Sequence, residues 1–253
     1  MITVSEALKI IDKIATFSMQ ATWDNSGLQI GRTSAKINTA IFALDLTKEA
    51  VEQAKGVGAE LIVTHHPAIF HKPSSITDGH WQHELLLECA ENNMAVISVH
   101  TNWDACKGGV NDVLATSLGS KNLKPLDKET KLGRVGEVPV TSLEKFAEKI
   151  KKTLNLSSLT VIDAGKKVHK VAVCGGTGID YLDEAFAFGC DTFLTSDIRY
   201  HEAQQGAFGG MNLIDGTHQA TEELSLNNLR KQFAKLSKLE TYLAKETRIM
   251  QVM

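Results

Sequence analysis

The spacing of hydrophobic positions predicts helices and strands in alternation along the first hundred residues. Apolar residues recur at helical spacing between Ser5 and Phe17, which predicts an amphipathic helix with Ser5 as its cap. A turn-rich segment over 21–31 then feeds a short strand. Further strands are predicted over 39–44, 60–64 and 95–99, and further helices over 48–55 and 82–92. This alternation is typical of an α/β fold with a largely parallel sheet.

The second half of the chain repeats the first. Residues 54–66 align without a gap with residues 185–197: helix end, glycine turn, acidic residue, strand and threonine all match. Residues 94–98 align in the same way with residues 211–215, and each of these strands runs into a histidine. Two matches in the same order favour a duplication over chance similarity.

The duplication predicts an α/β fold made of two similar lobes, each with a mixed sheet and helices packed on it. We expect one lobe over 1–125 and the other over 126–253, with residues 121–130 as the connector. In sheets of this kind, ligands bind at the carboxyl ends of the strands. The polar residues that follow the predicted strands are therefore the first candidates for chemistry.

Five of these polar residues form a candidate metal site. His65 and His66 directly follow the strand over 60–64, Asp104 follows the strand over 95–99, and His218 and Glu222 stand four residues apart, on one face of a predicted helix. Five ligands exceed the three that a single catalytic zinc takes and suit two metals ~3.5–4 Å apart, which promote hydrolysis. Mixed nitrogen and oxygen ligation is compatible with Zn, Fe, Mn, Co or Ni. Since neither His65 nor Asp104 is expected to fill a core, alanine at either should remove a metal site and leave the fold largely intact.

Three further residues are candidates for catalysis. Asp197 and His201 form a second pair four residues apart, for which we expect a role beside the metals or in proton transfer. Capping of the following helix by Ser196 or Asp197 is the competing interpretation. His100 can orient a ligand or bind substrate, or be a satisfied core histidine.

A glycine-rich turn, Gly175–Gly178, follows a predicted strand and can in principle cradle a phosphate. It lacks the Lys-Ser/Thr of a P-loop and the full G-x-G-x-x-G pattern. A plain strand-to-helix turn is the favoured interpretation.

Composition narrows the function classes. A net charge of −3 gives no whole-chain attraction to nucleic acid or an anionic membrane. Four scattered cysteines, without C-x-x-C spacing, argue against a disulfide framework and against a zinc knuckle. Charged residues in the first turns exclude a signal-peptide apolar region, and no apolar run approaches ~20 residues. We therefore expect a cytoplasmic protein without a membrane span.

Five motifs, taken in order, resemble the GTP cyclohydrolase I type 2 homologue family, also called the Nif-three-like family. They span nearly the whole chain and together are highly specific. The motifs are Trp23-Asp24-Asn25-Ser26-Gly27-Leu28-Gln29, Thr64-His65-His66-Pro67, His100-Thr101-Asn102-Trp103-Asp104, Ser196-Asp197-Ile198-Arg199-Tyr200-His201 and Gly216-Thr217-His218-Gln219-Ala220-Thr221-Glu222.

The resemblance implies a duplicated α/β fold in its compact form, without the domain that some members insert between the halves. It implies a homohexameric ring with dinuclear metal sites facing its interior. The implied ligands fall on His65, His66, Asp104, His218 and Glu222, the set already singled out.

The family name implies hydrolysis of a nucleotide-like substrate, GTP first. Ring opening at a C–N bond also needs a proton donor for the leaving nitrogen, and our hypothesis for this donor is His201 or His100. Three alternatives stay open: a non-catalytic metal-binding protein that acts as an interaction or regulatory platform, a phosphoesterase, and a DNA-associated ring. The charge balance does not support the last of these.

Overall fold

The computed structural model describes residues 1–250, which form two compact units. The first unit contains Met1–Cys106 and Leu226–Thr247, and the second contains Lys107–Ser225 and the segment from Arg248. Each of the expected lobes thus holds most of one unit, while residues 107–125 pack with the second and residues 226–247 with the first. Within residues 1–250, no helix is both long and apolar enough to cross a membrane.

A five-stranded mixed sheet forms the centre of the first unit. Four of its strands are parallel, and the edge strand β2 runs antiparallel to β6. The strands, in order across the sheet, are β13 (Glu240–Leu243), β4 (Thr39–Ala43), β5 (Leu61–Thr64), β6 (Ala95–Ser98) and β2 (Gly27–Ile30). A separate two-stranded sheet pairs β1 (Ile2–Thr3) with β3 (Lys36–Ile37).

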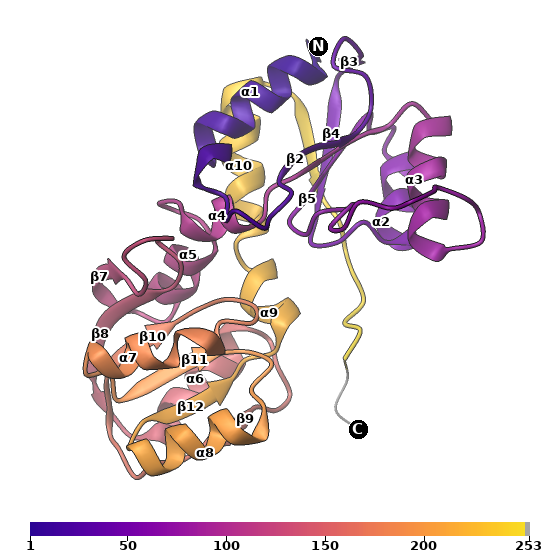
Figure 1. Ribbon diagram of the computed structural model, residues 1–253. Coiled ribbons are helices and arrows are strands. Elements are labelled where there is room, and N and C mark those ends of the chain that lie inside the picture. The colour runs from indigo at the N-terminus through magenta and orange to yellow at the C-terminus, as the bar shows by residue number, and fades with distance from the viewer. Residues whose placement is uncertain (251–253) are drawn as a thin grey trace. The chain divides into compact units, whose positions relative to one another are not determined.

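Helices cover both faces of this sheet, because successive strand residues point to opposite faces (Figure 1). Ile41 and Ile62 pack in the core under α2 and α3, whereas the Phe42 ring lies 5.5 Å from that of Phe233 in α10. The helices are α1 (Val4–Ile14) and α10 (Leu226–Ser237) on one face, α2 (Lys48–Gly56) and α3 (Trp81–Glu91) on the other, with η1 (Phe17–Met19) and α4 (Thr101–Ala105) beyond the strand ends.

A six-stranded mixed sheet forms the centre of the second unit. Its strands β10, β11 and β12 are parallel, and the remaining pairs are antiparallel. The strands, in order, are β7 (Lys121–Pro125), β8 (Arg134–Thr141), β10 (Val168–Val173), β11 (Thr192–Thr195), β12 (Asn212–Asp215) and β9 (Thr160–Ile162). Since residues 121–125 form β7, the expectation that they belong to a connector is wrong.

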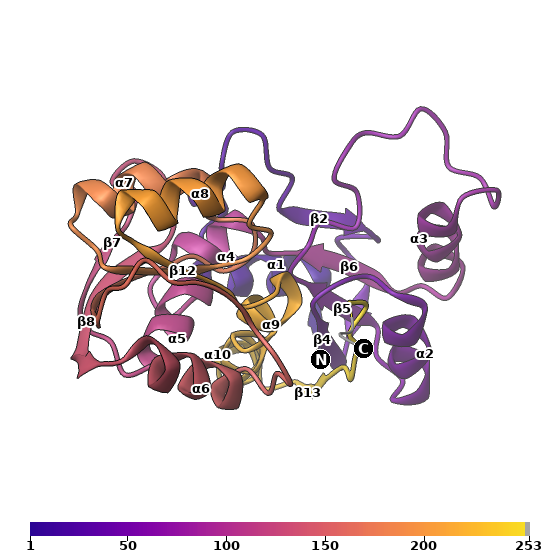
Figure 2. The same ribbon diagram turned by 90° about the horizontal axis from the view of Figure 1, so that it is seen from below.

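The helices of the second unit also lie on both faces of their sheet (Figure 2). Leu194 and Ile214 pack in the core under α5 and α6, and their neighbours Phe193 and Leu213 pack on the side of α7 and α8. The helices are α5 (Val110–Ser117), α6 (Leu143–Thr153), η2 (Ile179–Tyr181), α7 (Leu182–Ala187), α8 (Tyr200–Gly209) and α9 (His218–Glu223).

The structure confirms the α/β class and the duplication. In each unit three parallel strands alternate with helices, and a fourth strand pairs antiparallel with the last of them. The turns before β5 and β11 use glycines of nearly identical backbone conformation, Gly58 at φ 66° and Gly189 at φ 68°. The gap-free alignment of the sequence therefore describes equivalent positions in space.

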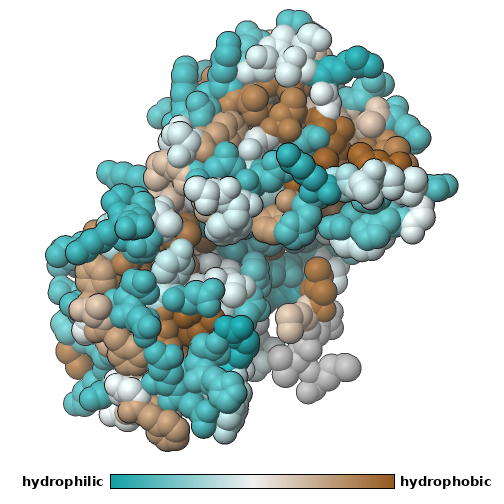
Figure 3. Space-filling view, in the orientation of Figure 1, coloured by the Kyte–Doolittle hydropathy of each residue, from teal (hydrophilic) through white to brown (hydrophobic). Residues whose placement is uncertain are grey.

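Hydrophilic and hydrophobic side chains are interspersed on the face seen in Figure 3. Single apolar side chains on a surface are normal and need no explanation. Several large aromatic side chains are nevertheless more than half exposed, among them Trp23, Trp81, Tyr200 and Phe208.

Candidate functional site

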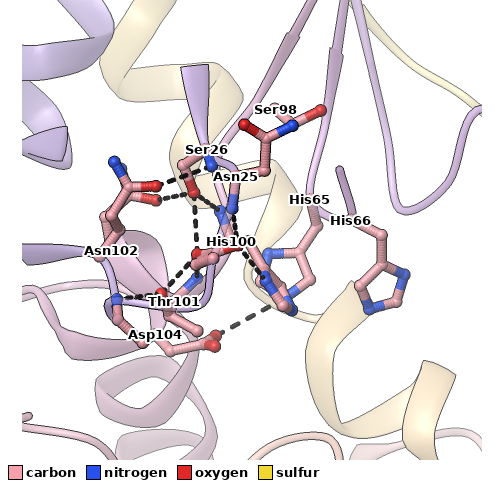
Figure 4. A network of polar contacts seen from close by, with 12 residues as sticks. Asn25, Ser26, His65, His66, Ser98, His100, Thr101, Asn102 and Asp104 are labelled. Atoms are coloured by element: carbon pink, nitrogen blue, oxygen red, sulfur yellow. Dashed lines mark hydrogen bonds and ion pairs between the residues drawn. The ribbon is translucent and has the colours of Figure 1, made fainter. Parts of the chain in front are cut away.

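Three imidazoles of the first unit meet at the carboxyl end of its sheet (Figure 4). His65 and His66 follow β5, and His100 follows the neighbouring strand β6. Their ring centroids lie 5.0 to 5.6 Å apart. One ring nitrogen from each residue lies within 4.8 Å of the other two. Parallel pairing of β5 with β6 brings these residues together across more than thirty positions of sequence.

The neighbours of His65 and His66 determine which ring nitrogen faces the cluster. His65 Nδ1 lies 2.9 Å from the carbonyl oxygen of Val99, and His66 Nδ1 lies 2.8 Å from Asp45 Oδ1. Carbonyl and ionised carboxylate oxygens only accept hydrogen bonds, so each Nδ1 carries the proton. Each Nε2 then presents a lone pair, the form in which imidazole binds a metal.

His100 is oriented in the same way by a more deeply placed carboxylate. Its Nδ1 donates to Asp24 Oδ1 at 2.9 Å, and the backbone N–H of Thr101 donates to the other oxygen at 3.0 Å. Burial acts to raise the pKa of Asp24, but the hydrogen bonds from His100 and from the Thr101 hydroxyl hold it well below its usual range. Asp24 therefore stays ionised at neutral pH.

Asp104 joins this cluster from the short helix α4. Its Oδ1 lies 3.6 Å from His65 Nε2, and the side chain is buried. His65 itself has no exposed surface. The expectation that neither His65 nor Asp104 fills a core is thus wrong. Strands β4 and β6 enclose His65, which follows β5, and Asp104 is buried beside it.

The second unit brings together His218 and Glu222. Helix α9 begins at His218, so residues four apart share one face, as expected, and His218 Nε2 lies 3.3 Å from Glu222 Oε1. Thr217, directly before the helix, has φ 60°, a strained conformation for a β-branched residue. Strained backbone of this kind is typical of functional sites.

Asp197 orients His218. Its Oδ2 accepts a hydrogen bond from His218 Nδ1 at 2.7 Å and another from the Thr177 hydroxyl. Burial acts to raise the pKa of Asp197, but the hydrogen bonds from Thr177 and His218 lower it below its usual value. Asp197 thus stands to His218 as Asp45 stands to His66.

The expected pairing of Asp197 with His201 is wrong. Helix α8 begins only at Tyr200, with Arg199 as its N-cap, so Asp197 lies outside the helix and its side chain turns to His218. His201 is exposed, and its Nδ1 lies 3.2 Å from Gln204 Oε1. A catalytic role for His201 stays a prediction.

The glycine turn after β10 makes its hydrogen bonds within its own unit, as in a plain strand-to-helix turn. Three of its four amides donate to side chains of the same unit: Gly175 to Asn111, Gly176 to Thr221 and Gly178 to Thr195. Gly176 has φ 64°, and a Cβ there would overlap Glu222 Oε1 and approach His218 Nε2 to 3.2 Å. The backbone thus closes directly onto the imidazole–carboxylate pair.

These donor sets fit a divalent transition metal. The first unit offers three imidazoles and a carboxylate, and the second an imidazole and a carboxylate. Oriented Nε2 atoms and buried carboxylates are the ligands that Zn, Mn, Fe, Co and Ni accept. The structure therefore contains candidate metal-binding groups in both units.

Sequence reasoning missed Asp45 and assigned no role to Asp24. A signal for Asp45 was available, because it stands just after the predicted strand over 39–44, at the same edge as His66. Asp24 lies within the first family motif, but its hydrogen bond to His100 spans 76 positions and cannot be read from spacing.

The family model described as Duf34/NIF3 (NGG1p interacting factor 3) matches residues 2–251. The chain belongs to the Duf34/NIF3 family. Among its relatives, a "GTP cyclohydrolase 1 type 2 homolog" of Clostridium perfringens is 35% identical over 227 residues, which cover 87% of this chain and 86% of the relative. The expected family is thereby confirmed.

Solved structures show the same Duf34/NIF3 fold. The Staphylococcus aureus hypothetical protein SA1388 superposes with a TM-score of 0.91 at 27% identity, covering 99% of both chains. Reduced HcgD from Methanocaldococcus jannaschii superposes with a TM-score of 0.86 at 29% identity, covering 97% of this chain and 98% of that one.

Proposed function

We propose that this Duf34/NIF3 protein is a divalent-metal-dependent hydrolase of a nucleotide or related heterocycle. His65, His66, Asp104, His218 and Glu222 would hold two metal ions per chain. The name carried by its relatives points to GTP as the first substrate to examine.

The observation that carries this proposal is the convergence of three histidines. One ring nitrogen each of His65, His66 and His100 lies within 4.8 Å of the other two. Each of the three directs Nδ1 to an acceptor oxygen, and so does His218 beside Glu222. Converging imidazoles whose Nε2 is left to bind a metal support a role in metal binding.

A bound divalent metal would supply a water of lowered pKa and would polarise the bond under attack. The chain's own residues position that chemistry. Asp45 and Asp197 hold His66 and His218 in their binding tautomers. We propose that His201 donates a proton to the leaving nitrogen, with His100, fixed by Asp24, as the alternative donor.

Metal content is the first test. Elemental mass spectrometry on protein purified without a His tag should find two metals per chain, directly or after incubation with Mn, Zn or Fe. Electron paramagnetic resonance of the Mn-loaded protein distinguishes a coupled pair, expected for a dinuclear centre, from two isolated ions. Absence of metal under all conditions would contradict the proposal.

Turnover is the second test, on the fully metallated protein. Ring opening of GTP predicts release of formate, whereas a phosphoesterase predicts release of phosphate. Full metal loading without turnover of any nucleotide would contradict the hydrolase and favour a non-catalytic metal-binding protein.

The family resemblance also leads us to propose a homohexameric ring. Multi-angle light scattering on the metal-loaded protein should give six times the mass of one 27.6 kDa chain. A monomer or dimer at working concentration would contradict this part of the proposal.

A further inference from the structure

Two exposed aromatic rings converge next to the imidazole cluster of the first unit. The Trp23 ring centroid lies 6.1 Å from that of Phe70, and both lie close to His100, at 6.0 and 6.1 Å. Trp23 is 61% exposed and Phe70 is 42% exposed. An isolated exposed aromatic residue is unremarkable, but two that meet beside candidate metal ligands mark a surface built to contact something apolar and flat.

Polar contacts hold the two rings in place. The Asn25 side-chain amide donates to the carbonyl of Ile69 at 2.5 Å, and Gln29 accepts from the Ile69 N–H at 3.2 Å while donating to the carbonyl of Asn25 at 2.7 Å. The turn that carries Trp23 is thus tied to the loop that carries Phe70. Asn25 and Gln29 of the first family motif therefore have a structural role: they join this turn to the loop that carries Phe70.

The same turn is tied to the imidazole cluster. Asp24, next to Trp23, accepts hydrogen bonds from His100 and Thr101. Ser26 donates to Asn102 at 3.0 Å (Figure 4). One short segment therefore sets the position of an indole ring and the tautomer of a histidine. A ligand that rests on the indole is held at a fixed place relative to His100.

We propose that the Trp23 ring is a stacking platform for the planar heteroaromatic ring of the substrate, a purine in the first instance. The Phe70 ring, whose plane is tilted by 57° to that of Trp23, borders this platform. The proposal rests on the proposed function for its account of why the ring is held there. Every base has a flat π-face, and indole and phenyl rings bind such faces by stacking without reading their hydrogen-bonding groups. The aromatic platform would hold the ring, and the imidazole cluster would face the bond to be hydrolysed.

Tryptophan fluorescence tests the platform directly, because a stacked base quenches indole emission. GTP should quench the metal-loaded protein, whereas inorganic tripolyphosphate, which lacks the base, should not. Trp81→Phe is the matched control, since Trp81 is 65% exposed but lies on α3, and Trp103 is buried. Quenching should persist in Trp81→Phe and vanish in Trp23→Leu.

Affinity provides the second measurement. Trp23→Leu should weaken GTP binding roughly ten-fold or more, as expected from the loss of one stacked base, and should raise KM more than it lowers kcat. Trp23→Tyr retains an aromatic face and should restore most of the affinity. Circular dichroism and metal content, unchanged in both variants, show that the fold and the metal ligands are intact.

The outcomes separate this inference from the proposed function. GTP turnover with undiminished affinity in Trp23→Leu would overturn the platform and leave the hydrolase standing. Base-dependent quenching that Trp23→Leu abolishes, without any turnover, would support the platform and contradict the hydrolase. Equal binding of GTP and tripolyphosphate, or no binding of GTP, would overturn the platform.

Discussion

The two units use the same backbone position for different tasks. After β5 the first unit places His65 and His66, and after the equivalent β11 the second unit places Ser196 and Asp197. The first pair supplies candidate ligands directly, whereas Asp197 supplies an acceptor that orients His218, a candidate ligand on α9. A duplicated fold thus fixes where polar side chains gather, and single substitutions decide what each of them does.

The difference extends to how closely each cluster is enclosed. His65 is completely buried, while the His218 side chain is 37% exposed. In the second unit the backbone at Gly176 packs directly against His218 and Glu222. Three groups of substitutions test this contrast.

The largest effect is expected from the histidines of the first unit. His66→Ala should remove metal from the protein with little loss of stability, because His66 is only half-buried. His65→Ala should remove metal and also lower the free energy of unfolding by about 2 kcal/mol or more, because it leaves a cavity. Elemental analysis and urea unfolding measure both quantities.

His71→Ala, at an exposed histidine nearby in sequence, is the control and should change neither quantity. Retention of full metal content by His66→Ala would show that the assignment of ligands in the first unit is wrong.

An intermediate effect is expected at Gly176. Gly176→Ala and Gly189→Ala share a positive φ, which alone costs about 1–2 kcal/mol. Only Gly176→Ala also collides with Glu222, which should add about 1–3 kcal/mol and weaken metal binding. Thermal unfolding measures the stability of the two variants, and metal titration measures their metal affinity. The difference between the variants gives the effect of the collision with Glu222, because the backbone strain is common to both. Equal behaviour would mean that Glu222 moves aside freely.

The smallest effect is expected from the orienting carboxylates. Asp45→Asn and Asp197→Asn keep an acceptor but lose the charge, and each should weaken metal binding about 10–100-fold. Asp78→Asn, at an exposed position, is the control. Competition titration with a chelator measures the metal affinity of each variant. A loss of affinity in only one of the two would show that Asp45 and Asp197 do not play equivalent roles.

Local pattern predicted much of the fold. Hydrophobic runs identified β5 and β6, the gap-free repeat identified β11 and β12, and spacing identified the His218–Glu222 pair, since each of these depends on neighbouring residues. The burial of His65 was not predictable, because it depends on strands that are distant in sequence. The start of α8 at Tyr200 was missed for a local reason: Asp197 adopts a positive φ that spacing does not show.

The sequence predicted the residues of the candidate site but not the hydrogen bonds that orient them. Residue type and position predicted five ligands, and the structure places His65 beside Asp104 and His218 beside Glu222, while their role as ligands stays a prediction. Asp24 and Asp45 act on His100 and His66 across 76 and 21 positions, and only the folded sheet brings them into contact.

The return of the chain to the first unit has a consequence for its synthesis. Strand β13 pairs with β4 across some two hundred positions, and Glu246 accepts from the backbone of Leu44 at 2.6 Å. The second unit is nearly contiguous, so it can complete its sheet while the ribosome is still adding residues. The first unit, although its N-terminal part emerges earlier, lacks an edge strand and a covering helix until residues 226–247 have been synthesised. Its unpaired β4 edge is therefore the part of the nascent chain that most needs protection from aggregation.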